Sequence, residues 1–337
     1  MKYLHKIIIG KLGSRPSEYS YNYGNTKDIK LAISKKGVSI EAMLSKRLTK
    51  EEMLASDGYL FPDALKKALL IYLIKYSKSL TIKTLLVQID ETFYQIEEIP
   101  KIYSLIEGEL NLKMHVGWRN EKVIQDILWF TKSTSRQRMA SLYALLTAKS
   151  KRFEIEKFMY LWIAFNGMYG YLSQLKEKGK WYEWQELIFF QKFNGWGKRS
   201  FEDNKIKFKL YHETKALLKC YASDITKKFF NTENGVELDY KIQQMFFSVT
   251  NEVSDLSAYG FLITQFAYWL RCELFHANRP TMFFLFDEDM DLKYLRQINS
   301  LLEEYLDENL YKWFDKEYRE NYLKINAQKI ERPVKKR

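Results

Sequence analysis

The chain has 337 residues, which suits two domains better than one, because single hydrophobic cores stop growing at about 250 residues. Hydrophobic residues make up 46% of the sequence and prolines number only 5, which excludes a disordered chain or a fibre. Lysines and arginines outnumber acidic residues by 54 to 42, and the net charge of +12 favours a polyanionic partner such as nucleic acid or an anionic membrane surface.

The sequence gives no support for export or for a membrane anchor. The two cysteines, Cys220 and Cys272, form no CxxC pair, so a disulfide framework is not expected and a reducing compartment fits best. The N-terminus has too short an apolar stretch for a signal peptide. No apolar run approaches the roughly 18 residues that span a bilayer. We therefore expect a soluble, cytoplasmic protein with no membrane partner.

The first part of the chain alternates between strand-like and helix-like segments. Residues 6–9, 29–34 and 38–44 have the composition of short strands, and a turn-rich stretch occupies residues 13–25. Leucines at helical spacing predict a helix over residues 64–77, and residues 80–95 are predicted as one strand. Residues 1–120 are therefore predicted to form a small α+β domain, with a role in sensing or restraint.

The second part of the chain changes to helical periodicity. Residues 121–150 are predicted as a polar helical connection, and from residue 151 aromatic and aliphatic residues fall on one helical stripe. The stripe consists of Phe153, Phe158, Leu161, Trp162, Phe165, Tyr169 and Leu172. Further helices are predicted within residues 181–193, 205–230, 255–275 and 292–314. The fold class is thus α+β overall, with an all-α bundle over residues 151–315 and a basic tail over 316–337.

Several familiar kinds of active site lack sequence support. The histidines at positions 5, 115, 212 and 276 show no spacing that places two ligands on one helix face or strand, so no metal site is expected. The sequence also has no GxGxxG, GxxxxGK[ST] or GxSxG motif. We therefore expect neither a cofactor nor a metal.

The segment whose side chains are best suited to catalysis is YWLRCELFHANRP, residues 268–280. It joins an apolar helix to a helix breaker, which places Arg271 in the last helical turns and His276 at or just beyond the helix end. Arginine supplies a fixed positive charge for phosphate, and histidine exchanges a proton near neutral pH. The pair suits attack of a ribose 2′-OH on the adjacent phosphodiester, although an Arg near a helix-terminal His is by itself a weak pattern.

A second segment, FMYLWIAFNGMYG at residues 158–170, strengthens the interpretation of LRCELFH at 270–276. Together they resemble the HEPN superfamily, closest to its Apea-like branch, over residues 151–315. The resemblance implies a helical bundle that forms a homodimer, with two Arg and His motifs facing one cleft. It implies an endoribonuclease of defence or toxin systems, with Arg271 and His276 as catalytic residues and with an antitoxin or sensor as a candidate partner.

The resemblance is incomplete next to the motif, where Cys272 stands at a position that is often polar in relatives, followed by Glu273. Glu273 and Asn166 are our candidates for supporting residues, although an Asn on a packed helix more often satisfies neighbouring backbone groups. Aromatic and basic residues alternate over residues 181–209, a mixture that stacks bases and holds phosphates or simply forms a core with a solvated face. We expect Lys198, Arg199 and Arg279 to contact RNA.

The sequence thus predicts a metal-independent endoribonuclease whose partner is RNA. Two alternatives remain at this point. One is a non-catalytic RNA or nucleotide sensor of the same fold, and the other is a module whose basic face binds an acidic protein. Salt-dependent RNA binding without cleavage would favour the first alternative, and absence of RNA affinity the second.

Overall fold

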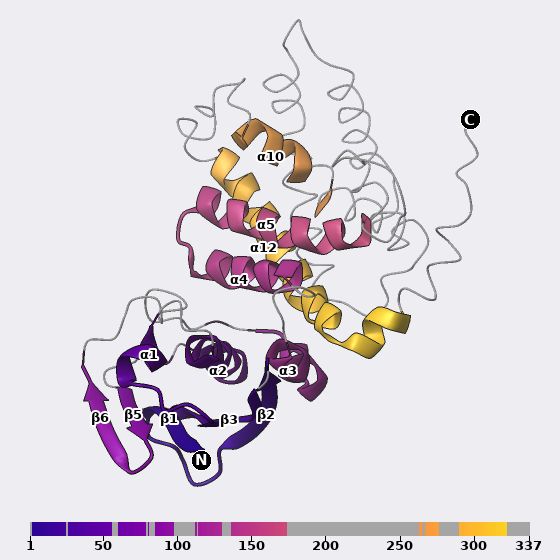
Figure 1. The fold of residues 1–337 in the computed structure, drawn as a ribbon. Helices are drawn as coiled ribbons and strands as arrows, with labels where there is room; N and C mark the ends of the chain where they lie inside the picture. Colours follow the sequence, from indigo (N-terminus) through magenta and orange to yellow (C-terminus); the bar gives the residue numbers. More distant parts are fainter. Residues whose placement is uncertain are drawn as a thin grey trace, which may run out of the picture. The chain divides into compact units, whose positions relative to one another are not determined.

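The computed structural model describes residues 2–24, 26–55, 60–78, 80, 85–97, 112, 114–129, 136–173, 263–264, 267–275 and 290–321. The fold is α+β, with a six-stranded antiparallel sheet and helices in the N-terminal part and a helical region after it (Figure 1). The chain divides into two compact units. Unit 1 comprises residues 1–136 and 311–316, and unit 2 comprises residues 137–310 and 317–337. Among the helices described, none is long and apolar enough to cross a membrane.

The sheet of unit 1 has the strand order β2-β3-β4-β1-β5-β6, and every neighbouring pair is antiparallel. The N-terminal strand β1 therefore lies inside the sheet, between β4 and β5. Alternate residues of β1 and β5 are buried, so one face of the sheet carries the core, and in β4 the first four residues are all buried. The strands are β1 (Tyr3–Gly10), β2 (Ser17–Tyr23), β3 (Thr26–Ser34), β4 (Gly37–Leu44), β5 (Leu85–Ile89) and β6 (Thr92–Ile96).

The structure corrects two sequence predictions in this sheet. Strand β2 lies within the stretch predicted as turns, because Tyr19 and Tyr21 alternate with exposed polar residues and point into the core. The single strand predicted over residues 80–95 is a hairpin of β5 and β6. The chain reverses at Asp90, whose φ of 51° is a turn conformation that Asp tolerates.

One helical layer covers the core face of the sheet (Figure 1). Its main element is α2 (Leu60–Tyr76), which confirms the predicted helix and begins four residues earlier, with Pro62 in its first turn. The shorter helices around it are α1 (Lys50–Leu54), η2 (Val116–Arg119) and α3 (Glu121–Leu128). Lys67 of α2 is buried, and its ammonium lies 2.9 Å from both Asp63 Oδ2 and the carbonyl oxygen of Leu128, which fastens α2 to the end of α3.

The last part of unit 1 comes from far along the chain. The 3-10 helix η4 (Leu310–Phe314) supplies Tyr311 and Phe314, whose ring centroids lie 6.1 and 5.6 Å from that of Trp118. The Tyr311 ring also stacks on His115 at 5.1 Å and covers Gly117 so closely that a Cβ there would overlap it. Trp118 is fully buried as a result.

The long described helices of unit 2 are α4 (Arg136–Ser150), α5 (Glu154–Ser173), α10 (Ala267–Phe275) and α12 (Met290–Asn309). The predicted stripe of α5 is buried at Phe158, Leu161, Trp162, Phe165 and Tyr169, which confirms its core-facing role. Among the stripe residues whose side chains are described, Phe153 is the exception, with 74% of its surface exposed, because it precedes the first residue of the helix. Residues 316–321 are also helical.

Charged side chains hold α12 against its neighbours in unit 2. The ammonium of Lys149 is buried and lies 3.4 Å from Glu303 and 3.1 Å from Asp307. Glu154 at the start of α5 binds two residues of α12, Arg296 at 3.1 Å and Asn299 at 2.8 Å. These contacts fix the register of α4 and α5 along α12.

Candidate functional site

The structure places the two motif-bearing helices of unit 2 in contact. The indole of Trp162 in α5 and the phenol ring of Tyr268 in α10 have centroids 6.2 Å apart. Trp162 also packs against Phe158 and Phe165, which belong to the same segment. The two segments that the sequence singled out, about a hundred residues apart, are therefore neighbours.

Arg271 lies on α10 and is half-buried, whereas Ala267 and Leu270 on the same helix are fully buried. Its position follows from helical spacing, because Leu270 faces the core and the next residue is rotated by about 100° toward the edge of that face. A guanidinium at such an edge keeps its alkyl chain in apolar surroundings and its head near water.

The remaining predicted residues are only partly within the described chain. Asn166 is exposed on α5, so it does not serve as a buried partner of backbone groups. Glu273 is part of the α10 backbone, and its side chain lies outside the description. The other four predicted site residues lie outside the described residues, namely His276, Lys198, Arg199 and Arg279.

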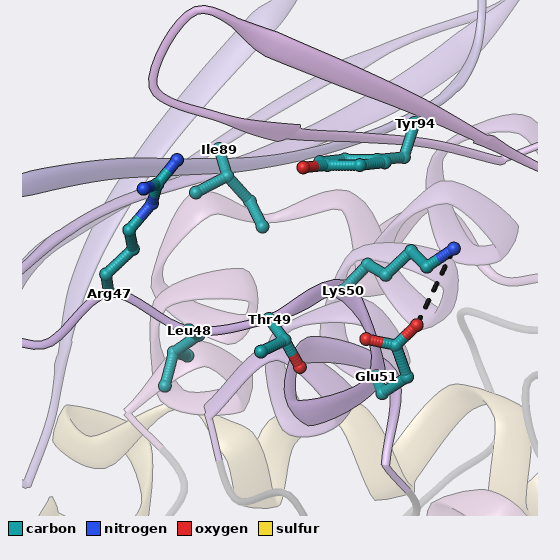
Figure 2. Close-up of a pocket in the computed structure, with 7 residues that line it drawn as sticks. All are labelled: Arg47, Leu48, Thr49, Lys50, Glu51, Ile89 and Tyr94. Atoms are coloured by element: carbon teal, nitrogen blue, oxygen red, sulfur yellow. Dashed lines mark ion pairs between the residues drawn. The ribbon is translucent and has the colours of Figure 1, made fainter.

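Unit 1 contains a cavity that sequence reasoning missed. Its volume is about 410 Å³, and it lies between the connection from β4 to α1 and the β5–β6 hairpin (Figure 2). No sequence motif links these two segments. They lie close together because β4 and β5, the strands that lead into and out of them, both pair with β1 in the sheet. The lining residues are Arg47, Leu48, Thr49, Lys50, Glu51, Ile89 and Tyr94.

Two cations and one aromatic ring dominate the chemistry of this cavity. The ring of Tyr94 lies on the side of the hairpin, and the heads of Arg47 and Lys50 lie toward opposite ends of the cavity (Figure 2). The Lys50 ammonium is 5.7 Å from the centroid of the Tyr94 ring. Arg47 Nε lies 3.8 Å from Asp90 Oδ2, and Lys50 Nζ lies 3.6 Å from Glu51 Oε1. Both ion pairs are long and solvent-exposed, so each contributes little and is readily exchanged for another anion.

The wall of the cavity is held by contacts behind it. The fully buried imidazole of His5 accepts a hydrogen bond at Nε2 from the Leu48 backbone N–H at 2.9 Å, and its Nδ1 lies 3.1 Å from the Tyr3 carbonyl oxygen. Burial lowers the pKa of His5 from its ordinary value, and the hydrogen bond with Tyr3 opposes that effect only in part.

The start of α1 is held by a capping box. Thr49 accepts a hydrogen bond from the Glu52 N–H, and the Glu52 carboxylate accepts one from the Thr49 N–H. Hydrogen bonds from Lys46 and from the Thr49 backbone hold the pKa of Glu52 below its usual value. The connection that carries Arg47 and Lys50 is thus fixed at Leu48 and at Thr49.

Within the described ranges, no three His, Cys, Asp or Glu side chains are grouped so as to hold a metal ion. Comparison with protein-family models, with curated proteins and with solved structures found no match to this chain.

Proposed function

We propose that the chain is a metal-independent endoribonuclease of the defence or toxin type, with Arg271 and His276 as its reactive groups. The observation that carries the proposal is the packing of α5 on α10 through Trp162 and Tyr268. These helices bear the two segments that resemble the HEPN superfamily, and a chance likeness would not require them to be neighbours.

The chemistry assigns a separate role to each residue. A base removes the proton of the ribose 2′-OH, the oxygen attacks the adjacent phosphorus, and the bond to the 5′ oxygen breaks as that oxygen takes up a proton. His276 is the residue suited to proton transfer, and the permanent charge of Arg271 stabilises the additional negative charge on the phosphoryl oxygens. The products are a 2′,3′-cyclic phosphate and a 5′-hydroxyl.

A homodimer supplies the two proton-transfer groups that this reaction needs. One His276 provides a single group, whereas attack requires a base and departure requires an acid. Two copies of the motif facing one cleft provide both. We therefore expect the active species to be a dimer whose specific activity falls when the protein is diluted below its dissociation constant.

The test compares His276→Ala and Arg271→Ala with Arg152→Ala, a control that removes an exposed arginine from the same unit. Cleavage of a mixed-sequence RNA should fall about 10²- to 10⁴-fold for His276→Ala and about 10²- to 10³-fold for Arg271→Ala. RNA affinity should fall only for Arg271→Ala, because that change removes a phosphate contact. The control should retain parental cleavage and affinity.

A second arm of the test addresses the mechanism. Chelation with EDTA should leave the cleavage rate unchanged, and mass spectrometry of the products should identify 2′,3′-cyclic phosphate ends. The proposal fails if either motif variant, folded by circular dichroism, cuts RNA at the parental rate. Loss of activity in EDTA that magnesium restores would refute the metal-independent mechanism.

A further inference from the structure

We infer that the cavity of unit 1 binds a free nucleotide, with its base on Tyr94 and its phosphate held by Arg47. The inference goes beyond RNA cleavage and does not depend on it, since every lining residue belongs to unit 1. A volume of about 410 Å³ falls within the range of about 300 to 1,000 Å³ that is typical of small-molecule sites.

The lining residues match the two parts of a nucleotide. Ile89 supplies an apolar wall, and Tyr94 supplies a ring on which a base stacks (Figure 2). Arg47 and Lys50 supply positive charge at the ends of the cavity, and guanidinium groups bind phosphate oxygens in a forked geometry. A purely apolar ligand would make no polar contact with the two cations. Inorganic phosphate alone would make no contact with the Tyr94 ring or the apolar wall.

The charges in the cavity are available at modest cost. The side chains of Arg47 and Lys50 are 58% and 43% exposed, and their present partners lie at 3.8 and 3.6 Å. A phosphate that approaches Arg47 to hydrogen-bonding distance would replace its weak pair with Asp90 by shorter, charge-assisted contacts. Glu51, the acid that lines the cavity, is an acceptor for the hydroxyl groups of a ribose.

The cavity is also preorganised, which reduces the entropy lost on binding. His5 fixes Leu48 from behind, and the capping box fixes Thr49. On the opposite wall, Asp90 holds the hairpin, since its carboxylate accepts from the Leu4 N–H at 2.9 Å and its own N–H donates to the Leu4 carbonyl at 2.8 Å. The segments that carry Arg47 and Tyr94 are both tied to strand β1.

The experiment is isothermal titration calorimetry on the full-length protein with each of the four ribonucleoside 5′-monophosphates. These probes contain no phosphodiester bond, so the proposed cleavage cannot consume them. At least one should bind, and its affinity should be at least about tenfold higher than that of its nucleoside or of inorganic phosphate alone, a difference of about 1.4 kcal/mol. Raising the salt concentration should weaken binding, because the phosphate contact is electrostatic.

Matched variants locate the binding site. Tyr94→Ala and Arg47→Ala should each weaken binding at least about tenfold, whereas Tyr94→Phe, which keeps the ring, should not. Phe93→Ala and Arg15→Ala are the controls, because Phe93 neighbours Tyr94 on β6 but is 58% exposed and does not line the cavity, and Arg15 is exposed elsewhere in unit 1. Arg152→Ala, which removes an exposed arginine of unit 2, should also leave nucleotide binding unchanged.

Three results would overturn the inference. The first is absence of binding by all four mononucleotides at millimolar concentration. The second is equal affinity for inorganic phosphate, which would make the ring irrelevant. The third is parental affinity in the Arg47 and Tyr94 variants, which would place the bound nucleotide elsewhere on the chain. Binding only of 5′-phosphorylated oligoribonucleotides would replace a free nucleotide by an RNA end as the ligand.

Discussion

The imidazole of His5 has a structural role that its residue type would not suggest. Each of its nitrogens meets one backbone group, since Nε2 accepts from Leu48 and Nδ1 faces the Tyr3 carbonyl. Only the neutral ring with its proton on Nδ1 satisfies both contacts, because a protonated ring donates from both nitrogens. In a protonated His5 ring, Nε2 also carries a proton, so it could not accept the hydrogen bond from the Leu48 N–H.

This arrangement predicts that stability depends on pH. Above the ordinary histidine pKa of 6.5, both the folded and the unfolded chain carry a neutral His5. As pH falls below 6.5, the unfolded chain takes up a proton that the folded chain does not, so the free energy of unfolding decreases until the folded pKa is reached. The midpoint of thermal unfolding of unit 1 should therefore decline from pH 7.5 to pH 5.

NMR titration of the His5 ring provides the direct measurement. The ring should titrate below pH 6.5, and its nitrogen shifts should identify the Nδ1–H tautomer. In a His5→Gln variant the decline between pH 7.5 and pH 5 should be smaller than in the parent. A His5 ring that titrates at or above 6.5 would contradict the prediction.

At the same scale, the sequence identified candidate residues by chemical type but not by environment. The sequence pattern around the four histidines gives no sign that His5 is fully buried. Asn166 is a candidate supporting residue by chemical type, and the structure places it on the exposed side of its helix. Burial depends on which neighbours cover a helix face, and this is information that no single segment contains.

Among the secondary structure elements, the long periodic ones were the most predictable. The stripe of α5 and the leucines of α2 repeat at helical spacing over several turns, and both helices are present. Strand β2 was hidden because Ser17–Tyr23 alternates tyrosine with small polar residues between Pro16 and Gly24, so its flanks and polar positions resemble a loop. The β5–β6 hairpin was missed because its turn, Asp90-Glu91, lacks the glycine that usually marks two-residue turns.

The contact of α4 with α5 depends on Gly167. A Cβ at this position would overlap the hydroxyl of Ser141 in α4, and Ser141 itself is buried. Gly167→Ala should therefore lower the free energy of unfolding of unit 2 by about 1–3 kcal/mol, the usual cost of overpacking, even though alanine favours helix more than glycine does.

The double variant provides the check on this explanation. Ser141→Ala removes the overlapping oxygen, and the serine Cβ lies 3.4 Å from the position of the new methyl group. Chemical denaturation should show that Gly167→Ala costs much less in the Ser141→Ala background than alone. Equal costs in the two backgrounds would show that Ser141 is not the obstacle.

On the scale of the whole chain, unit 1 is discontinuous, because residues 311–316 complete it after the long intervening unit 2. The sequence placed this segment at the end of the helical bundle, since it continues the apolar periodicity of the preceding helix. The cavity beside Tyr94 was likewise beyond sequence reasoning. Both features arise from contacts between residues far apart in the chain.

A comparison of a protein truncated after residue 310 with one truncated after residue 321 tests whether residues 311–316 are needed to complete unit 1. Without Tyr311 and Phe314, the fully buried Trp118 loses the rings that cover it. Hydrogen exchange of peptides covering residues 114–129 should be faster in the shorter protein, whereas the longer one should match the full chain. Equal protection in both proteins would show that unit 1 is complete without the returning segment.

The same return of the chain has a consequence for biosynthesis. The ribosome releases strand β1 first and residues 311–316 only after nearly all of unit 2 has been translated. Until those residues are translated, the rings of Tyr311 and Phe314 cannot cover the indole of Trp118. The nascent N-terminal unit therefore exposes apolar surface, which chaperones bind. A message truncated within unit 2 would yield a polypeptide whose unit 1 lacks residues 311–316, and exposed apolar surface of this kind makes a chain a substrate for chaperones and proteases.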